Sequence, residues 1–257
     1  MLFSVKNTAF PGLLDLLAPH SCRGCGRIGS PLCHRCKNYI TNSPCHICPN
    51  CKQPVATKAS LGATIASTPS AISTTTATTH MTPTPCPNCP NLPPIYAVNT
   101  RTGLLDDIIR AYKYQSIRAL ATPLAELLDR TLPQNLGAHP IITPRPTATH
   151  HIRARGFDHT ALLARHLAKL RNYKVSPLLL RAKNTVQVGA NEKARTTQAA
   201  EAYALNPKIA PDPITTYILL DDIWTTGASI KSAINLLHSA NIKNDHIVVA
   251  LLAYSID

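Results

Sequence analysis

From about residue 95 onward, the hydrophobic positions along the chain follow two different periods. Four short apolar runs have the length of buried strands; they are residues 94–100, 139–143, 217–220 and 246–254. Four other segments carry apolar residues three and four positions apart, as amphipathic helices do; they are residues 103–114, 119–132, 159–170 and 229–240. In the second of these segments, the helix is expected to continue after Pro123. Because short apolar strands alternate with helices, the sequence predicts an α/β fold with a parallel sheet.

A pair of adjacent acids, Asp221 and Asp222, follows the third apolar run in the stretch YILLDDIWTTGAS. In a parallel sheet, ligands bind beyond the carboxyl ends of the strands. Adjacent residues of a strand point in different directions, so one carboxylate can face a ligand while the other supports it. Carboxylate oxygens accept hydrogen bonds from hydroxyl groups, and the pair is therefore suited to the vicinal diol of a sugar.

The residues after the acid pair predict a seat for a phosphate group. The segment Thr225–Ser229 leads into a predicted helix, whose first amides lack partners and carry partial positive charge. Gly227 allows a close approach of the backbone, and the Thr and Ser residues of the segment add hydroxyl donors. No lysine follows the glycine, which excludes a nucleoside-triphosphate P-loop. A diol site beside a phosphate seat predicts a ribose-5-phosphate site; the alternative is a strand, a turn and a helix with ordinary caps.

All nine cysteines lie within the first 89 residues, most of them in C-x-x-C pairs. The N-terminal stretch PGLLDLLAPHS predicts a short helix and lacks the features of an export signal, so the pairs indicate metal ligation and not disulfides. Two such pairs complete a tetrahedral structural site, and one or two Zn²⁺ ions are expected. The stronger set is Cys22, Cys25, Cys33 and Cys36. The second set is Cys48, Cys51, Cys86 and Cys89, which leaves Cys45 spare; His34 and His46 are alternative ligands.

The cysteine region is interrupted by residues 54–85, which are rich in Ser, Thr, Ala and Pro and contain no aromatic residue. Such a segment cannot bury much apolar surface and is expected to be an unstructured insert. The predicted organisation is a zinc-ribbon region at 1–94, which contains the insert, and a second domain at 95–257.

The chain is basic, with a formal net charge of +13 over 257 residues. Residues 145–195 carry eleven Lys and Arg against two acids, which indicates an anionic partner such as a phosphate compound or nucleic acid. No run of about 18 apolar residues occurs, so no membrane span is expected. We therefore expect the protein in the cytoplasm, either free or at the inner face of the membrane.

The stretch ILLDDIWTTGAS resembles the motif with which type I phosphoribosyltransferases bind phosphoribosyl pyrophosphate (PRPP). The resemblance implies that Asp221 and Asp222 hold the ribose hydroxyls. The 5-phosphate would be held by Thr225, Thr226, Gly227, Ala228 and Ser229. Trp224 lies inside the motif, either over the edge of the core or at the edge of the pocket.

Beyond this motif, the chain resembles the ComF family of competence proteins. The segments that carry the resemblance are LLDLLAPHSCRGCG, LLDDIIRAYKYQSIRALATPLAELL, IITPRPTATHHIRARGFDHTALLARHLA and NTVQVGANEKARTTQAAEAY. The implied fold is a type I phosphoribosyltransferase-like parallel sheet with an N-terminal, cysteine-rich zinc-ribbon region. The chain departs from the family in three places: Asp158-His159 stand for Asn-Gln, Lys52 stands for a glycine, and Gln198 stands for an asparagine.

The same resemblance points to a basic cluster for the pyrophosphate of PRPP. Its members are Arg145, Arg153 and Arg155, and guanidinium groups are suited to this ligand. Weaker candidates are Lys113, Gln187 and Arg195. Taken singly, each basic residue is more often solvated surface.

Two functions follow from the resemblance, and they are compatible. In the first, the protein binds PRPP and acts in natural competence, where it handles single-stranded DNA with a competence helicase or the translocation machinery as partner. In the second, it is an active phosphoribosyltransferase of nucleotide metabolism that uses PRPP with Mg²⁺ and an unidentified acceptor. The small share of aromatic residues, 5%, limits any base-stacking surface. A structural zinc adaptor with an empty transferase fold is the third alternative.

Overall fold

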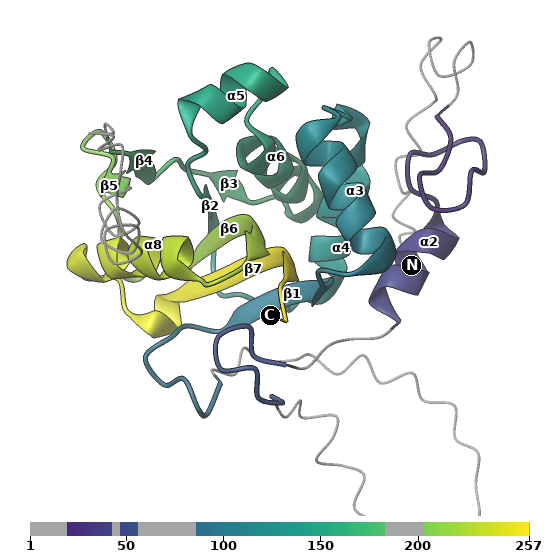
Figure 1. The fold of residues 1–257 in the computed structure, drawn as a ribbon. Coiled ribbons are helices and arrows are strands. Elements are labelled where there is room, and N and C mark those ends of the chain that lie inside the picture. Colours follow the sequence, from purple (N-terminus) through teal and green to yellow (C-terminus); the bar gives the residue numbers. More distant parts are fainter. Residues whose placement is uncertain (1–19, 43–46, 56–85, 183–202, 257) are drawn as a thin grey trace, which may run out of the picture.

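The computed structural model describes residues 20–42, 47–55, 86–182 and 203–256 (Figure 1). Several predictions fall outside these ranges and are not tested by the structure. They concern most of the N-terminal stretch PGLLDLLAPHS, Cys45, His46, residues 56–85 of the insert, Gln187, Arg195 and Gln198.

A five-stranded parallel sheet with the order β1–β7–β6–β2–β3 forms the centre of the structure. Its strands are β1 (Ile95–Thr100), β2 (Ile141–Pro144), β3 (Lys174–Val175), β6 (Tyr217–Trp224) and β7 (Ile247–Tyr254). The two long strands, β6 and β7, are buried along almost their entire length, as expected of a parallel sheet that is covered on both faces. This confirms the predicted α/β fold class and is consistent with a phosphoribosyltransferase-like sheet.

Four of the helices are the ones that the hydrophobic spacing predicts: α3 (Gly103–Tyr114), α4 (Ala121–Thr131), α6 (His159–Arg171) and α8 (Ala228–Ser239). Helix α4 begins before Pro123, because a proline is tolerated in the first turn, where no backbone donor is needed. Single 3₁₀ turns, η2 (Arg118–Leu120) and η3 (Asn244–His246), precede α4 and β7. No helix in the described ranges combines the length and the apolar character that a membrane crossing needs.

Five short helices and strands were not predicted: α2 (His34–Thr41), α5 (Thr149–Arg155), β3 and the antiparallel pair β4 (Leu179–Arg181) and β5 (Tyr203–Leu205). Helix α5 has no fully buried residue, so its sequence carries no apolar stripe that could have indicated it. The strands β4 and β5 have three residues each, which is too short for a visible alternation.

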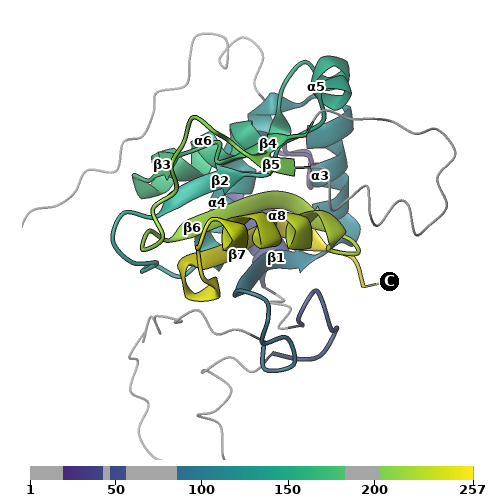
Figure 2. The same ribbon diagram turned by 90° about the vertical axis from the view of Figure 1, so that its left-hand side faces the viewer.

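Each face of the sheet carries its own hydrophobic core. Ile218 and Leu220 of β6 point to the core that contains side chains of α3, α4 and α6. Tyr217 and Leu219 point the other way, to the core that contains side chains of α8. Figure 2 shows α8 on one side of the sheet, with α4 and α6 on the other. The alternation along β6 therefore also directs Asp221 and Asp222 to different sides of the strand. It does not continue beyond them, because Ile223 packs against the first core and Trp224 belongs to the second.

Strand β6 is longer than the sequence predicts. The apolar run suggests that the strand ends at Leu220, but the structure extends it to Trp224. The reason is that β7 continues as a partner, with Ile223 opposite Ala253 and Trp224 opposite Tyr254. The acid pair consequently lies within the carboxyl half of the strand and not beyond its end.

The two cysteine clusters dock against opposite cores. Around the first cluster, Leu32 and Ile40 are buried in the core of α3, α4 and α6, and Lys37 forms an ion pair with Glu126 of α4. Around the second cluster, Ile47 and Leu92 pack against the core of α8. Figure 1 accordingly places α2 beside α3 and α4, whereas residues 47–55 lie near β1 and the C-terminus.

Candidate ligand and metal sites

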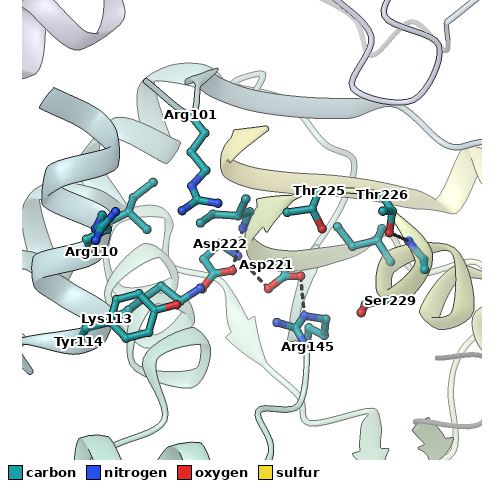
Figure 3. Close-up of a pocket in the computed structure, with 15 residues that line it drawn as sticks. Arg101, Arg110, Lys113, Tyr114, Arg145, Asp221, Asp222, Thr225, Thr226 and Ser229 are labelled. Atoms are coloured by element: carbon teal, nitrogen blue, oxygen red, sulfur yellow. Dashed lines mark hydrogen bonds and ion pairs between the residues drawn. The ribbon is translucent and has the colours of Figure 1, made fainter. Parts of the chain in front are cut away.

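A pocket of about 280 Å³ lies at the carboxyl end of β6. Both members of the acid pair and the whole segment Thr225–Ser229 line it (Figure 3). The basic residues of its lining are Arg101, Arg110, Lys113 and Arg145. The structure thus brings together the predicted diol site, the predicted phosphate seat and one member of the predicted basic cluster.

The strand order explains why the pocket lies at this place. The chain leaves β2 through α6 to reach β3 on one side, and it leaves β6 through α8 to reach β7 on the other. The connections of two neighbouring strands therefore diverge, which leaves a crevice at their carboxyl ends. The backbone N–H of Arg145 donates to the carbonyl of Leu220 over 2.9 Å and joins the end of β2 to β6 at this crevice.

Asp222 is 2% exposed and is held from the side of α3 and α6. Its Oδ2 accepts from Lys113 Nζ at 2.8 Å and from His159 Nε2 at 2.6 Å, and its Oδ1 accepts from the backbone of Ile223 at 2.7 Å. Burial by itself raises the pKa of the Asp222 carboxyl. The hydrogen bond from His159 and the charge of Lys113 outweigh this effect and hold the pKa below its ordinary value.

Asp221 is equally buried but is held by other elements. Its Oδ2 forms an ion pair with the guanidinium of Arg145, and its Oδ1 accepts from the backbone N–H of Asp222 at 2.8 Å. Arg145 in turn donates to the hydroxyl of Tyr203 on β5 at 2.9 Å. Burial raises the pKa of the Asp221 carboxyl, and the charge of Arg145 offsets this only in part because Asp222 adds a second negative charge nearby.

The two carboxylates differ in the hydrogen bonds that they can still accept. An ionised carboxylate has about four acceptor positions. Asp222 uses three of them within the protein, whereas Asp221 uses two. Asp221 therefore retains the greater capacity to bind two neighbouring hydroxyl groups, with Asp222 able to accept one more.

The segment after β6 has the geometry that its sequence suggests. Gly227 has a φ of +75° and is the N-cap of α8, which begins at Ala228. The Thr226 hydroxyl accepts from the Ala228 backbone N–H at 3.4 Å, which is a long contact at the start of the helix. Trp224 is 1% exposed and belongs to the core of α8, so it lies over the edge of the core and not in the lining of the pocket.

The other two arginines of the predicted basic cluster are not part of the pocket lining. Arg153 is exposed on α5. Arg155 lies with its guanidinium 5.5 Å from the ring of Tyr114 and donates to His159 Nδ1 at 2.9 Å. Asp158, one of the departures from the ComF pattern, caps α6 by accepting from the backbone N–H of Ala161 at 3.1 Å.

Sequence reasoning did not identify Arg101 or Arg110 as residues of the site, and it noted His159 only as part of a departure from the ComF pattern near the expected pocket. Arg110 and Tyr114 lie one turn apart on α3 and share a face next to Lys113, and this spacing is a signal that could have found Arg110. Arg101 lies in the turn before α3 and pairs with Asp106 at 2.8 Å. No local pattern marks His159, because its partners are distant in sequence.

The eight cysteines in the described ranges form the two sets of four that the spacing predicts. Within each set the candidate ligand atoms lie within 4.8 Å of one another, and all eight thiols are free of disulfides. Measured Sγ–Sγ distances are 3.6 Å for Cys25–Cys33, 3.6 Å for Cys51–Cys86 and 3.9 Å for Cys48–Cys89. Tetrahedral Zn–S bonds of about 2.3 Å imply sulfurs roughly 3.8 Å apart, so both sets fit a zinc ion.

The first set also stabilises a thiolate. Burial raises the pKa of Cys22, but hydrogen bonds from the backbone N–H groups of Cys33, Cys25 and Gly24 lower it to about 6. A metal ligand must be deprotonated, and the environment of Cys22 favours that form, whereas burial raises the pKa of Cys36 in the same set. Both clusters can hold a metal such as zinc in a closed, structural site, because four protein ligands leave no open position.

Compared with models of known protein families and with curated proteins, the sequence matches none of them.

Proposed function

We propose that the protein binds PRPP, together with Mg²⁺, in the pocket around Asp221 and Asp222, as a ComF-type protein with a role in natural competence. The observation that carries the proposal is that a diol-binding acid pair and a phosphate seat at the start of a helix share one pocket. Asp221 and Asp222 together can still accept about three hydrogen bonds, which is enough for the two hydroxyls of a ribose.

The charges around the pocket support a ligand with anionic groups at both ends. Lys113 and Arg145 are paired with the two aspartates, and two further positive charges line the pocket: Arg110, and Arg101, which is itself paired with Asp106. In Figure 3 these two arginines lie on one side of the acid pair, and the Thr225–Ser229 segment lies on the other. PRPP has a 5-phosphate at one end of its ribose and a pyrophosphate at the other, which matches this arrangement.

If the protein is also an enzyme, the reaction breaks the bond between C1 of the ribose and the pyrophosphate and forms a bond from C1 to an acceptor. Arg101 and Arg110 would stabilise the leaving pyrophosphate, and the acid pair would fix the ribose. Pyrophosphate release in the presence of candidate acceptors would identify this alternative, a phosphoribosyltransferase of nucleotide metabolism. A competence protein that only binds PRPP would release none.

The test of PRPP binding is calorimetric titration of the purified full chain with PRPP and Mg²⁺, with the fluorescence of Trp224 as a second readout. The variant Asp221→Asn/Asp222→Asn removes both charges of the pair. Asp245→Asn is the matched control, because it removes an exposed carboxylate of η3 that is not part of the pocket lining. We expect saturable binding that the control retains and the double variant loses. Equal binding by all three proteins would refute this site.

A role in handling single-stranded DNA is supported by one further observation at the mouth of the pocket. Tyr114 is 67% exposed, and arginines of two different helices, Arg110 and Arg155, lie near it. An exposed aromatic ring between cations is suited to stacking of a base beside a bound phosphate. We propose that DNA would bind over this surface.

A further inference from the structure

The contacts of His159 differ from those of the other residues around the acid pair. His159 is the first residue of α6 and is 2% exposed. Its Nε2 lies 2.6 Å from Asp222 Oδ2, and its Nδ1 lies 2.9 Å from Arg155 Nη1, with the Thr147 hydroxyl farther away at 3.4 Å. Both nitrogens of a buried ring are therefore engaged, one by an anion and the other by a cation.

These two partners determine where the proton of the ring lies. A guanidinium group has only N–H donors, so Nδ1 has to accept from Arg155 and cannot carry a hydrogen. Nε2 must then carry the hydrogen and donate it to Asp222. A doubly protonated ring would place an Nδ1–H against an N–H of Arg155. We propose that Arg155 holds His159 as the neutral Nε2–H tautomer, and that His159 in this form positions Asp222 in the site.

The backbone and the neighbours of His159 support a positioning role. The hydroxyl of Tyr112 on α3 donates to the His159 carbonyl at 2.7 Å, so α3 also holds the backbone of His159. His159 and Lys113 together occupy Oδ2 of Asp222, which leaves Oδ1 as the oxygen with a remaining acceptor position. The position of this oxygen thus depends on α6 and, through Arg155, on α5.

The same contacts exclude His159 as a general base in the pocket. Neither ring nitrogen is free to take a proton from a ligand, since Nε2 donates to Asp222 and Nδ1 accepts from Arg155. Arg155 likewise acts through His159 and is a positioning residue. Its position in the sequence had suggested a direct contact with pyrophosphate instead. The link from Arg155 to Asp222 does not depend on the identity of the ligand.

The tautomer can be measured without any ligand. Two-bond ¹H–¹⁵N NMR spectra of the full chain should show His159 as a neutral ring with its hydrogen on Nε2, and the spectrum of His159→Gln identifies its signals. Arg155→Met removes the donor and leaves Nδ1 free to take a hydrogen, while the Asp222 carboxylate still requires a hydrogen on Nε2, so this variant should show the doubly protonated ring. Arg153→Met removes an exposed arginine of the same helix and should leave the wild-type pattern unchanged. An imidazolium or an Nδ1–H tautomer in the wild type, or no effect of Arg155→Met, would overturn the proposal.

The positioning effect rests on the proposed function and is measured by PRPP affinity. A glutamine at position 159 can donate an N–H to Asp222 and accept from Arg155, whereas a leucine can do neither. We expect His159→Leu to weaken PRPP binding by about tenfold or more, and His159→Gln to remain within about threefold of the wild type. Equal losses in two folded variants would contradict the positioning role. If the wild type does not bind PRPP, the proposed function fails, while the NMR result still decides the tautomer.

Discussion

The indole ring of Trp224 fills the space next to Gly227 in which any larger residue would place its β-carbon. A β-carbon at position 227 would lie 2.2 Å from Trp224 Cζ2, and the backbone there has a φ of +75°. The last residue of β6 and the N-cap of α8 therefore fit together only because residue 227 is a glycine. This contact connects the core of α8 to the backbone of the proposed phosphate seat.

Gly227→Ala is expected to destabilise the protein by about 1–3 kcal/mol and to shift the emission of Trp224, because the ring has to move. Gly26→Ala is the matched control, since Gly26 has a φ of +73° but no atom within 4 Å of its β-carbon position. The control should show only the cost of a left-handed backbone, about 1 kcal/mol, and an unchanged emission. Urea unfolding followed by fluorescence measures both effects. Indistinguishable variants would mean that the contact with Trp224 is unimportant.

The two aspartates should differ in their contribution to stability. Asp222→Asn leaves Lys113 and His159 without their anion and is expected to lower the free energy of unfolding by about 3 kcal/mol. Asp221→Asn should cost less, because burial disfavours the charged form of Asp221 and its pKa is raised. Chemical unfolding at pH 7 compares the two, and a larger loss for Asp221→Asn would contradict the assignment.

The contribution of Asp222 should also depend on pH with a definite sign. Its pKa is lowered in the folded protein, so its stabilising effect is complete above the ordinary value of about 4 and is lost as the pH falls below it. Unfolding curves of the wild type and of Asp222→Asn should therefore converge as the pH is lowered from about 5 toward 3. A gap that stays constant over this range would argue against an ionised, stabilising Asp222.

The cysteine clusters predict a metal content of two zinc ions for each chain. Cys36→Ala and Cys89→Ala each remove one ligand from a different set and should lower the content to one. Cys45→Ala should leave it at two if Cys45 is the spare cysteine. Elemental analysis of the purified variants measures the content. Loss of both ions in a single variant would show that the clusters do not form independently.

Binding of single-stranded DNA should separate into an electrostatic and a stacking part. In a plot of the logarithm of the binding constant against the logarithm of the salt concentration, Arg110→Met should make the slope shallower by about 0.7. This is the change expected for the loss of one phosphate contact with a single strand. Tyr114→Ala should instead weaken binding by about 1–3 kcal/mol at every salt concentration. Fluorescence anisotropy with a labelled oligonucleotide tests both. Wild-type affinity that does not change between low and moderate salt would rule out this surface as a DNA site.

The features that the sequence predicts correctly depend on residues that are close together in the chain. The period of apolar residues in α3 and α8 reports which face is buried, and the C-x-x-C spacing brings two sulfurs to one side of a turn. The acid pair and the Thr225–Ser229 segment are likewise contiguous, so their order alone suggested one pocket. Where the signal was weak, as in α5 and the three-residue strands β4 and β5, the elements were missed.

The sequence by itself thus determined the fold class, the sets of cysteines and the sharing of one pocket by the acid pair and residues 225–229. Only the tertiary structure decided which side chains hold that pair. His159 and Asp222 lie 63 positions apart, and Arg145 and Asp221 lie 76 apart, so no local pattern relates them. The alternation along β6 sends the two carboxylates toward different elements, and the strand order brings the end of β2 beside β6. The folded sheet, and not the motif, therefore gives the two adjacent aspartates different environments.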